Sequence, residues 1–487
     1  MGARFLAVDL GATSGRVMLG TWEEGRLALR ELRRFPNGPV SVRGALHWDV
    51  LRLWEEIRTG LSGAGPLDGV GVDSWGIDFA LLDEAGELLG NPHHYRDRRT
   101  SGMPEEVDRH VPPERLYERT GIQRLAFNTL YQLFSMRRAG DRRLEAARTL
   151  LLIPDLFHYW MSGRRQAEYT NASTTQLCDV TTRGWASDLV EELGLPTRIL
   201  PPIRPPGTIL GPLSAEVAGG AGLGSSVPVI AGATHDTASA VAAVPGLDEH
   251  SAFVSSGTWN LVGGEAGAPI RGEQARRRDF TNEGGVEGTV RFLKNVTGLW
   301  LVEECRRRWQ LEGRTHDVAG LVARAEQAPP LRSIVDPDAE DFARPGDLPA
   351  AIRRHCRDHG EPEPRDEGEV IRCCLESLAL KHRLVVDGLE EVTGRQIDTL
   401  RVVGGGSRNR LLCRLIADAC GRRVVAGPAE ATALGNVLVQ AVATGHLPDV
   451  GAGREVIARS VRQEVYEPSG TAGWDAALRR LGAQLTR

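Results

Sequence analysis

The first candidate site is an aspartate followed by a tight turn of small residues. Asp9 comes directly after the apolar run 5–8, and the turn Gly11-Ala12-Thr13-Ser14-Gly15 leads into a second run at 16–22. Small residues let phosphate oxygens approach backbone N–H groups, and a nearby carboxylate suits a hydrated Mg²⁺ ion. The pattern fits the terminal phosphates of a nucleotide, and it also fits a plain β-hairpin with a solvated aspartate.

The second candidate is the segment Thr234-His235-Asp236-Thr237. It follows the apolar strand predicted at 227–232 and precedes a run of small residues at 238–241. Phosphoryl transfer to a hydroxyl needs a carboxylate within hydrogen-bond reach of that hydroxyl. Asp236 is the candidate for this general base, and the alternative is an aspartate that caps the following helix.

Three further segments place small or polar residues where predicted strands end. Ser255-Ser256-Gly257-Thr258 repeats the first turn, with N–H and hydroxyl donors in place of a lysine. Gly404-Gly405-Gly406 joins a predicted strand to a helix, where a charged or flat ligand can approach the backbone. The segment 72–79, Val-Asp-Ser-Trp-Gly-Ile-Asp-Phe, combines carboxylates with an aromatic ring, as polyol sites do. Tight turns and a bulged core strand are the structural alternatives.

The scarcity of lysine excludes several kinds of ATP site. Only Lys294 and Lys381 are lysines among 59 basic residues. No Gly-Lys pair exists, so a P-loop is excluded, and the protein-kinase motifs are absent. A Schiff-base mechanism could use only these two side chains.

The predicted elements that position these residues alternate between strands and helices. Strands are expected at 5–8, 16–22, 27–32 and 70–73, with a helix over 50–61. A loop-rich stretch at 200–232 follows, and near residue 250 the order strand, small-residue turn, strand recurs. A long helix is expected over 370–392, ending near Gly394, and strands and helices alternate over 399–444. This order predicts an α/β protein with mixed sheets and a duplicated plan.

Composition narrows the class of protein. The chain has 487 residues, a net charge of −5 and a charged share of 25%, which is typical of a globular protein without nucleic acid as its main partner. No apolar run is long enough for a membrane span. Seven sparse cysteines, with no zinc-binding spacing, predict a reduced, cytoplasmic protein. Oligomeric state stays open between monomer and homodimer.

Taken in order, these segments resemble the FGGY carbohydrate kinases of the actin-like, hexokinase-like ATPase superfamily. The resemblance runs from Asp9 to the helix predicted over 429–444, and it includes 128–133, 168–177, 282–285 and 294–300. It implies two RNase H-like domains with mixed sheets flanked by helices and an active site in the interdomain cleft. It also implies ATP and Mg²⁺ as cofactors and a small-molecule ketose as substrate.

The resemblance also assigns roles to individual residues. Asp236 matches the proton acceptor, and Asp9 matches the acid that holds Mg²⁺ through water. The ketose positions are matched by Gly76, His235, Asp236, Thr237 and Asn295. The nucleotide positions are matched by Ala12, Thr13, Ser14, Gly15, Arg16, Thr258, Glu303 and Gly405, with Glu303 standing where relatives carry Gln.

The implied domains are an N-terminal sugar-side domain over 1–243 and a C-terminal nucleotide-side domain over 244–445. The segment 446–487 is expected to pack back on them. The resemblance leaves other ketoses or polyols open, among them L-fuculose, L-ribulose and xylulose. A non-enzymatic ATP switch of the actin/Hsp70 kind is an alternative that would leave Asp236 without a purpose.

Overall fold

The computed structural model describes residues 2–485, which form two compact units. The first unit comprises residues 2–246, Glu265–Phe292 and Ala431–Val461. The second comprises Leu247–Gly264, Leu293–Glu430 and residues 462–485. Each unit is therefore assembled from segments that are far apart in the sequence.

The first unit is built on a six-stranded mixed sheet with the order β11-β12-β6-β1-β2-β3. The strands of the whole unit, within this sheet and outside it, are β1 Ala3–Leu10, β2 Ser14–Glu23, β3 Arg26–Pro36, β4 Val40–Val42, β5 Ala45–His47, β6 Gly69–Ser74, β7 Phe79–Leu82, β8 Thr149–Leu152, β9 Ala167–Glu168, β10 Ile203–Arg204, β11 Thr208–Pro212, β12 Pro228–Ala231 and β15 Thr281–Gly284. Its helices are α1 Val50–Ser62, α2 Met103–Asp108, α3 Pro113–Thr120, α4 Thr129–Arg138, α5 Arg142–Ala146, α6 Ile153–Ser162, α7 Tyr169–Ala172, α8 Ser187–Glu192, α9 Ala215–Ala221, α10 Asp236–Ala242, α11 Glu273–Arg277, α17 Ala431–Ala443 and α18 Val450–Ser460.

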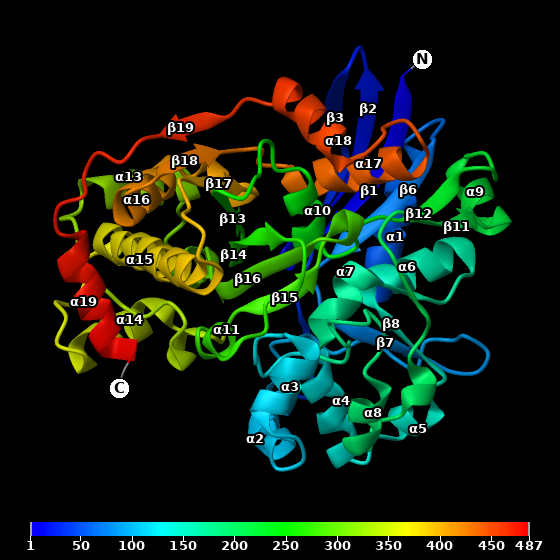
Figure 1. The fold of residues 1–487 in the computed structure, drawn as a ribbon, viewed down its shortest axis with the longest axis horizontal. Coiled ribbons are helices and arrows are strands. Elements are labelled where there is room, and N and C mark those ends of the chain that lie inside the picture. The colour runs from blue at the N-terminus through cyan, green and yellow to red at the C-terminus, as the bar shows by residue number, and fades with distance from the viewer. Residues whose placement is uncertain (1, 486–487) are drawn as a thin grey trace. The chain divides into compact units, whose positions relative to one another are not determined.

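The predicted hairpin and mixed sheet are confirmed. β1 pairs antiparallel with β2 and parallel with β6, and β12 is parallel to β6. Within the stretch 200–232, which the sequence indicated to be loop-rich, the predicted apolar strand before Thr234 is confirmed as β12, whereas β11 is a further strand of this sheet that was not expected. Figure 1 shows α17 and α18, in orange, beside the blue N-terminal strands.

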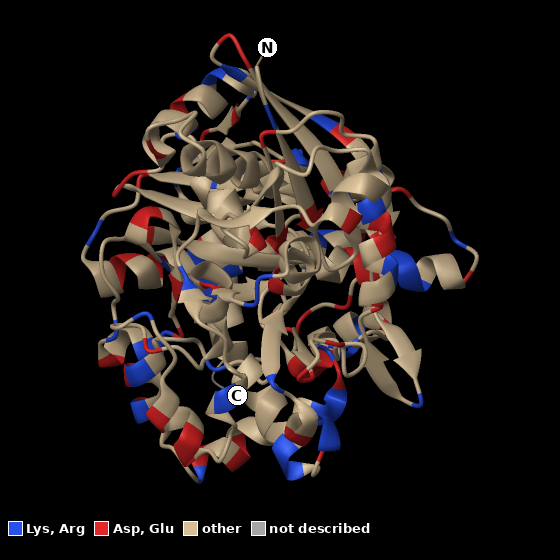
Figure 2. Ribbon diagram, turned by 90° about the vertical axis from the view of Figure 1, so that its right-hand side faces the viewer, with Lys and Arg blue, Asp and Glu red and all other residues tan. Residues whose placement is uncertain are grey.

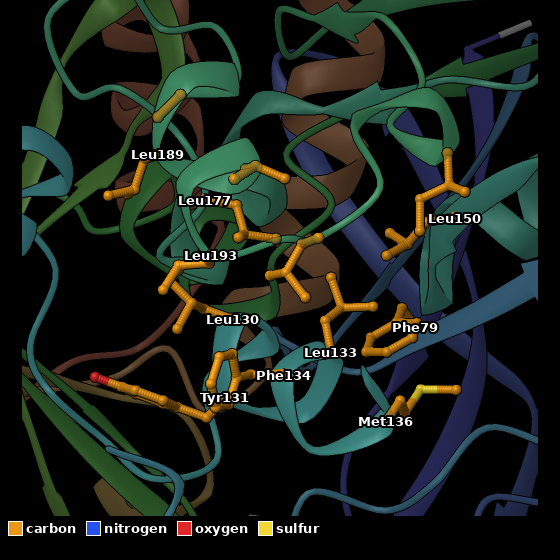
Figure 3. Packing of buried hydrophobic residues seen from close by; sticks show 14 of the residues in the cluster. Phe79, Leu130, Tyr131, Leu133, Phe134, Met136, Leu150, Leu177, Leu189 and Leu193 are labelled. Atoms are coloured by element: carbon orange, nitrogen blue, oxygen red, sulfur yellow. The ribbon is translucent and has the colours of Figure 1, made fainter. Parts of the chain in front are cut away.

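A helical part of the first unit has its own apolar core. α4 is buried along residues 129–136, and Leu130, Leu133 and Phe134 on this helix pack in one cluster with Phe79 of β7. Figure 3 shows these side chains grouped with Leu177, Leu189 and Leu193. Burial of such side chains stabilises the fold by about 1.5–3 kcal/mol each.

The second unit repeats the opening arrangement. β13 Ser251–Ser256 pairs antiparallel with β14 Trp259–Ala266 and parallel with β17 Thr399–Val403. Together with β16, the strands of this unit lie in the order β16-β14-β13-β17-β18-β19. The remaining strands are β16 Val290–Thr297, β18 Arg423–Ala426 and β19 Glu464–Tyr466, and the helices are α12 Trp300–Leu311, α13 Val318–Gln327, α14 Leu348–Asp358, α15 Glu367–Thr393, α16 Arg410–Cys420 and α19 Trp474–Leu485. β14 and β16 each cross a boundary between the two units.

Charged residues of both signs are concentrated on helices and loops, while most strands carry few (Figure 2). Among the described residues, no helix combines the length and the apolar composition that a bilayer crossing requires. The seven cysteines are all buried and none forms a disulfide.

A close contact between α10 and α17 gives the first testable prediction. A methyl group added at Gly435 of α17 would lie 1.7 Å from the carbonyl oxygen of Ser239 in α10. Gly435→Ala should therefore force the helices apart and lower the free energy of unfolding by about 1–3 kcal/mol. Thermal melting with circular dichroism measures the change.

Gly219→Ala is the matched control, because Gly219 is an exposed residue of helix α9 and no atom comes within 4 Å of its added methyl group. Helix propensity alone should stabilise this variant by up to about 1 kcal/mol. Equal melting of the two variants would contradict the close contact.

Candidate active site

Three acidic residues lie at one edge of the sheet in the first unit. β1 and β6 are parallel neighbours, and their register places Asp9 beside Asp73. The chain after β12 stays at this edge, since the N–H of Ser74 donates to the carbonyl oxygen of Thr234 over 2.9 Å. α10 then begins at Asp236. The carboxyl ends of parallel strands are where α/β proteins commonly bind ligands.

The three carboxylates repel one another, and Asp9 and Asp73 are buried. Burial raises the pKa of Asp73 well above its usual range, and the charge of Asp9 adds to the increase. A hydrogen bond of 2.5 Å from the Asn436 side chain to Asp73 acts in the opposite direction. Burial likewise raises the pKa of Asp236 to about 7, with Asp9 as the next cause, although 31% of the Asp236 side chain is exposed. A carboxyl group with this pKa can exchange a proton near neutral pH.

Asp236 also bonds to the start of its own helix. Its Oδ1 accepts the N–H of Thr237 over 2.6 Å and the Thr237 hydroxyl over 3.2 Å. The residue at the N-cap position is His235, not Asp236. Asp236 therefore does not cap the helix, although its Oδ1 bonds to Thr237 in the first turn. Its other carboxylate oxygen, Oδ2, takes no part in these two bonds.

The turn after Asp9 has the close packing that its small residues predicted. The N–H of Gly11 donates to the carbonyl oxygen of Ser14 over 2.9 Å. At Gly15, an added methyl group would lie 2.2 Å from the ring of Phe35. Arg16 lies opposite Asp9 in the β1–β2 register and forms an ion pair with it. A guanidinium group thus stands at the edge of the turn 11–15.

His235 lies between two carboxylates. Its Nε2 is 3.5 Å from Oδ1 of Asp236, and its Nδ1 is 3.6 Å from Oε2 of Glu283. Burial lowers the pKa of His235 well below its usual range, and Arg291 lowers it further, so the ring is neutral. Gly76 leaves room for it, since an added methyl group there would lie 3.3 Å from the imidazole. Gly76, His235, Asp236 and Thr237 are thus gathered in one place.

A buried glutamate holds the segment before His235. Glu168 accepts hydrogen bonds from the backbone N–H of Thr234 over 3.0 Å and from its hydroxyl over 2.8 Å. It also accepts the N–H of Thr170 over 2.7 Å and the hydroxyl of that residue. The Thr170 hydroxyl oxygen in turn accepts the N–H of His235 over 3.2 Å. Sequence reasoning had no signal for this role, because Glu168 and His235 are far apart in the chain.

A second buried carboxylate organises the end of β6. Asp78 accepts hydrogen bonds from the indole N–H groups of Trp48 over 2.6 Å and Trp75 over 3.1 Å, and from Gln132 over 2.8 Å. The two indoles lie 3.9 Å apart between ring centroids. Burial raises the pKa of Asp78 to about 6 despite these bonds. The sequence pointed to Trp75 and Asp78, but not to Trp48 as their partner.

The second unit positions its predicted site residues at the ends of β13 and β17. An added methyl group at Gly404 would lie 2.9 Å from the carbonyl oxygen of Ser256, whereas the one at Gly405 meets no atom within 4 Å. The carbonyl oxygen of Thr258 accepts the N–H of Gly298 over 3.1 Å. Two further predicted residues lie elsewhere in this unit: Asn295 on β16, and Glu303 on α12, where it pairs with Arg306 over 2.9 Å.

Comparison with protein families gives two matches that together span most of the chain. Residues 4–243 match the N-terminal domain, and residues 252–444 the C-terminal domain, of the FGGY family of carbohydrate kinases.

Similar curated proteins are rhamnulokinases. The chain is 45% identical over 481 residues to that of Bacteroides thetaiotaomicron, which covers 98% of both chains. It is 42% identical over 461 residues to that of Yersinia pestis biovar Antiqua, covering 93% of each. With that of Pectobacterium carotovorum it shares 41% identity over 485 residues, 98% of this chain and 96% of the relative.

Solved structures of sugar kinases have the same fold at low sequence identity. A gluconate kinase from Lactobacillus acidophilus superposes with a TM-score of 0.80 at 16% identity, covering 100% of this chain and 97% of the other. A xylulose kinase from Rhodospirillum rubrum gives 0.77 at 21% identity, covering 99% and 98%. With both domain matches and near full-length relatives above 40% identity, the chain belongs to the FGGY family of carbohydrate kinases.

Proposed function

We propose that this carbohydrate kinase transfers the γ-phosphate of ATP to the C1 hydroxyl of L-rhamnulose, giving L-rhamnulose 1-phosphate and ADP in the breakdown of L-rhamnose. The identity of 41–45% to rhamnulokinases over nearly the whole chain supports this substrate. The arrangement of Asp236, His235 and Gly76 at the sheet edge is the structural observation that carries the proposal. We place the reaction in the cytoplasm, where ATP is made and unbonded cysteines persist.

Asp236 is proposed to accept the proton of the C1 hydroxyl as that oxygen attacks the γ-phosphorus. The bond from phosphorus to the bridging oxygen of ADP breaks in the same step, and the proton moves to Asp236. A carboxylate whose pKa is near 7 is a stronger base than an ordinary aspartate and remains ionised in part at neutral pH.

The sugar is proposed to contact four residues of the first unit: Gly76, His235, Asp236 and Thr237. The two side chains next to Asp236 supply an imidazole and a hydroxyl for hydrogen bonds to sugar hydroxyls. The glycine allows the sugar ring or chain to approach the backbone. In the second unit, the same proposal gives Asn295 a sugar contact.

The nucleotide contacts are proposed from the turn and from three residues of the second unit. Backbone N–H groups and hydroxyls of Ala12, Thr13, Ser14 and Gly15, with the guanidinium of Arg16, can bind phosphate oxygens without a lysine. Thr258, Glu303 and Gly405 are the nucleotide contacts proposed in the second unit.

The acidic edge fits a hydrated Mg²⁺ ion. Oδ1 of Asp73 is buried without a hydrogen-bond partner, and Asp9 lies beside it in the register. Within residues 2–485, no three His, Cys, Asp or Glu side chains are grouped to hold a metal by themselves. Mg²⁺ usually keeps several waters and takes one or two carboxylates plus phosphates, so Asp9 would hold it through water. When bound, Mg²⁺ would neutralise charge on the phosphates.

Substrate choice is tested with a coupled ADP-release assay on a panel of ketoses. We expect kcat/KM for L-rhamnulose to exceed that for L-fuculose, L-ribulose and xylulose by about tenfold or more, because a site built to bond specific hydroxyls rejects sugars that leave its polar groups unpaired. Phosphorus NMR of the product should show a C1 phosphate. A higher kcat/KM for another ketose would replace the proposed substrate.

The proposed base is tested by Asp236→Asn. Loss of the proton acceptor should lower kcat about 10²–10⁴-fold while ATP binding, measured by calorimetry, stays nearly unchanged. Asp188→Asn serves as the control, because Asp188 forms a surface ion pair with Arg119 and its side chain is 63% exposed. A variant at Asp236 that keeps most of its kcat would rule out this role.

The stability of Asp236→Asn at different pH values tests whether the pKa of Asp236 is raised in the folded protein. The pKa of Asp236 is raised to about 7 in the folded protein, so above about pH 7 its ionised carboxylate destabilises the fold. Below about pH 4 the carboxyl group is protonated in both the folded and the unfolded protein, and the effect disappears. Asp236→Asn should therefore melt a few degrees higher than the wild-type protein at pH 8. This gap should close as the pH falls from 7 to 4. A gap that is independent of pH would contradict the raised pKa.

A further inference from the structure

Glu283 and Arg291 form a buried pair next to His235 that the proposed reaction does not yet use. NH1 of Arg291 lies 3.0 Å from Oε2 of Glu283, and the same oxygen is 3.6 Å from Nδ1 of His235. Arg291 is fully buried and 5% of the Glu283 side chain is exposed. A buried ion pair contributes little net stability, because desolvation offsets the attraction between the charges. The position of this pair therefore points to a role beyond stability.

Neighbouring backbone holds the guanidinium of this pair in place. Arg291 donates from Nε to the carbonyl oxygen of Gly284 over 2.8 Å and from NH2 to that of Thr170 over 3.4 Å. The N–H of Gly284 donates to the Ser173 hydroxyl over 2.8 Å. Since the Thr170 hydroxyl also accepts the N–H of His235, one residue holds both the guanidinium and the histidine backbone.

The neutral imidazole has a single N–H, and two carboxylates face it. Asp236 on α10 faces Nε2, and Glu283 on β15 faces Nδ1, with Arg291 of β16 behind Glu283. Oδ1 of Asp236, the atom nearest Nε2, already accepts two hydrogen bonds from Thr237, whereas Glu283 is paired with a guanidinium cation that favours its ionised form. The acceptor better suited to the ring N–H is therefore on the Nδ1 side.

We propose that Glu283, held by Arg291, is a positioning residue that fixes the proton of His235 on Nδ1 and leaves Nε2 as an acceptor for a sugar hydroxyl. The inference rests on the proposed function for the identity of that sugar. The distance of 3.6 Å is about 0.5 Å longer than a hydrogen bond, and bonds of this kind commonly tighten when substrate binds. With the opposite tautomer, Nε2 would donate to Asp236 and compete with the sugar hydroxyl for the base.

The direct test is nitrogen NMR of the full-length protein labelled on histidine, with His235→Asn used to assign the signal among twelve histidines. The two ring nitrogens have distinct shifts when protonated and unprotonated, so the spectrum reports the tautomer without substrate. We expect His235 to carry its proton on Nδ1. A proton on Nε2 in the wild-type protein would overturn the inference.

Two variants connect the tautomer to turnover. Glu283→Leu combined with Arg291→Met removes both charges and leaves neither partner buried alone. We expect this double variant to lose the Nδ1–H preference and to lower kcat/KM for L-rhamnulose about 10–100-fold. Glu283→Gln keeps the shape and an acceptor oxygen, so it should lie between the double variant and the wild type, and it serves if the double variant does not fold.

The control is Glu265→Gln, which breaks a different ion pair of the first unit, with Arg454 at 2.7 Å. It should change kcat/KM less than twofold and leave the His235 signal in place. An unchanged tautomer in the double variant would assign the pair a structural role only. If the wild-type protein does not phosphorylate L-rhamnulose, the proposed function fails, while the tautomer still decides the role of Glu283.

Discussion

The arrangement of the first unit depends on keeping three carboxylates together at one poorly hydrated sheet edge. Parallel pairing of β1, β6 and the chain after β12 leads to this gathering, because parallel strands end on the same side. Repulsion and desolvation oppose it, as the raised pKa values of Asp73 and Asp236 indicate. Partners must therefore offset the charges: Arg16 pairs with Asp9, and Asn436 donates to Asp73.

These partners come from the far end of the chain as well as from neighbouring strands. α17 returns to the first unit, where its Asn436 reaches Asp73 across 363 positions of sequence. One turn later, Gln440 donates to the carbonyl oxygen of Leu6 over 3.0 Å and to the side chain of Asn436. The close approach of Gly435 to α10 links this helix to the one that begins at Asp236. The geometry of the acidic edge is thus a property of the whole unit and not of its first segment.

Local patterns predicted the elements well, whereas contacts across long sequence separations were not predictable. The β1–β2 hairpin and the long helix α15, which ends at Thr393 and is capped by Gly394 with a φ of 68°, follow from short-range signals that a single sequence contains. The turn residues and the His235–Asp236 junction were found in the same way. The hydrogen bonds from Thr234 and Thr170 to Glu168 join segments that no periodicity relates, so that support could not be foreseen. In the stretch 200–232 the apolar run before Thr234 indicated β12, whereas β11 was missed because Gly211 and Pro212 lie within it.

The choice of arginine over lysine also has a structural reason at the site. Arg291 binds one carboxylate oxygen and two carbonyl oxygens in different directions, which a planar guanidinium with five N–H donors can do. An ammonium group has three donors on one atom and could not reach these acceptors together. The lysine Lys381 instead lies between Asp336 at 2.8 Å and Asp338 at 3.0 Å in the second unit, an arrangement that suits a compact charge. An overall preference for arginine in the composition would not by itself place an arginine where its N–H groups meet three acceptors. At position 291 one fully buried guanidinium binds both Glu283 and the backbone of α7. A lysine there would leave either the carboxylate or the carbonyl oxygens without a donor.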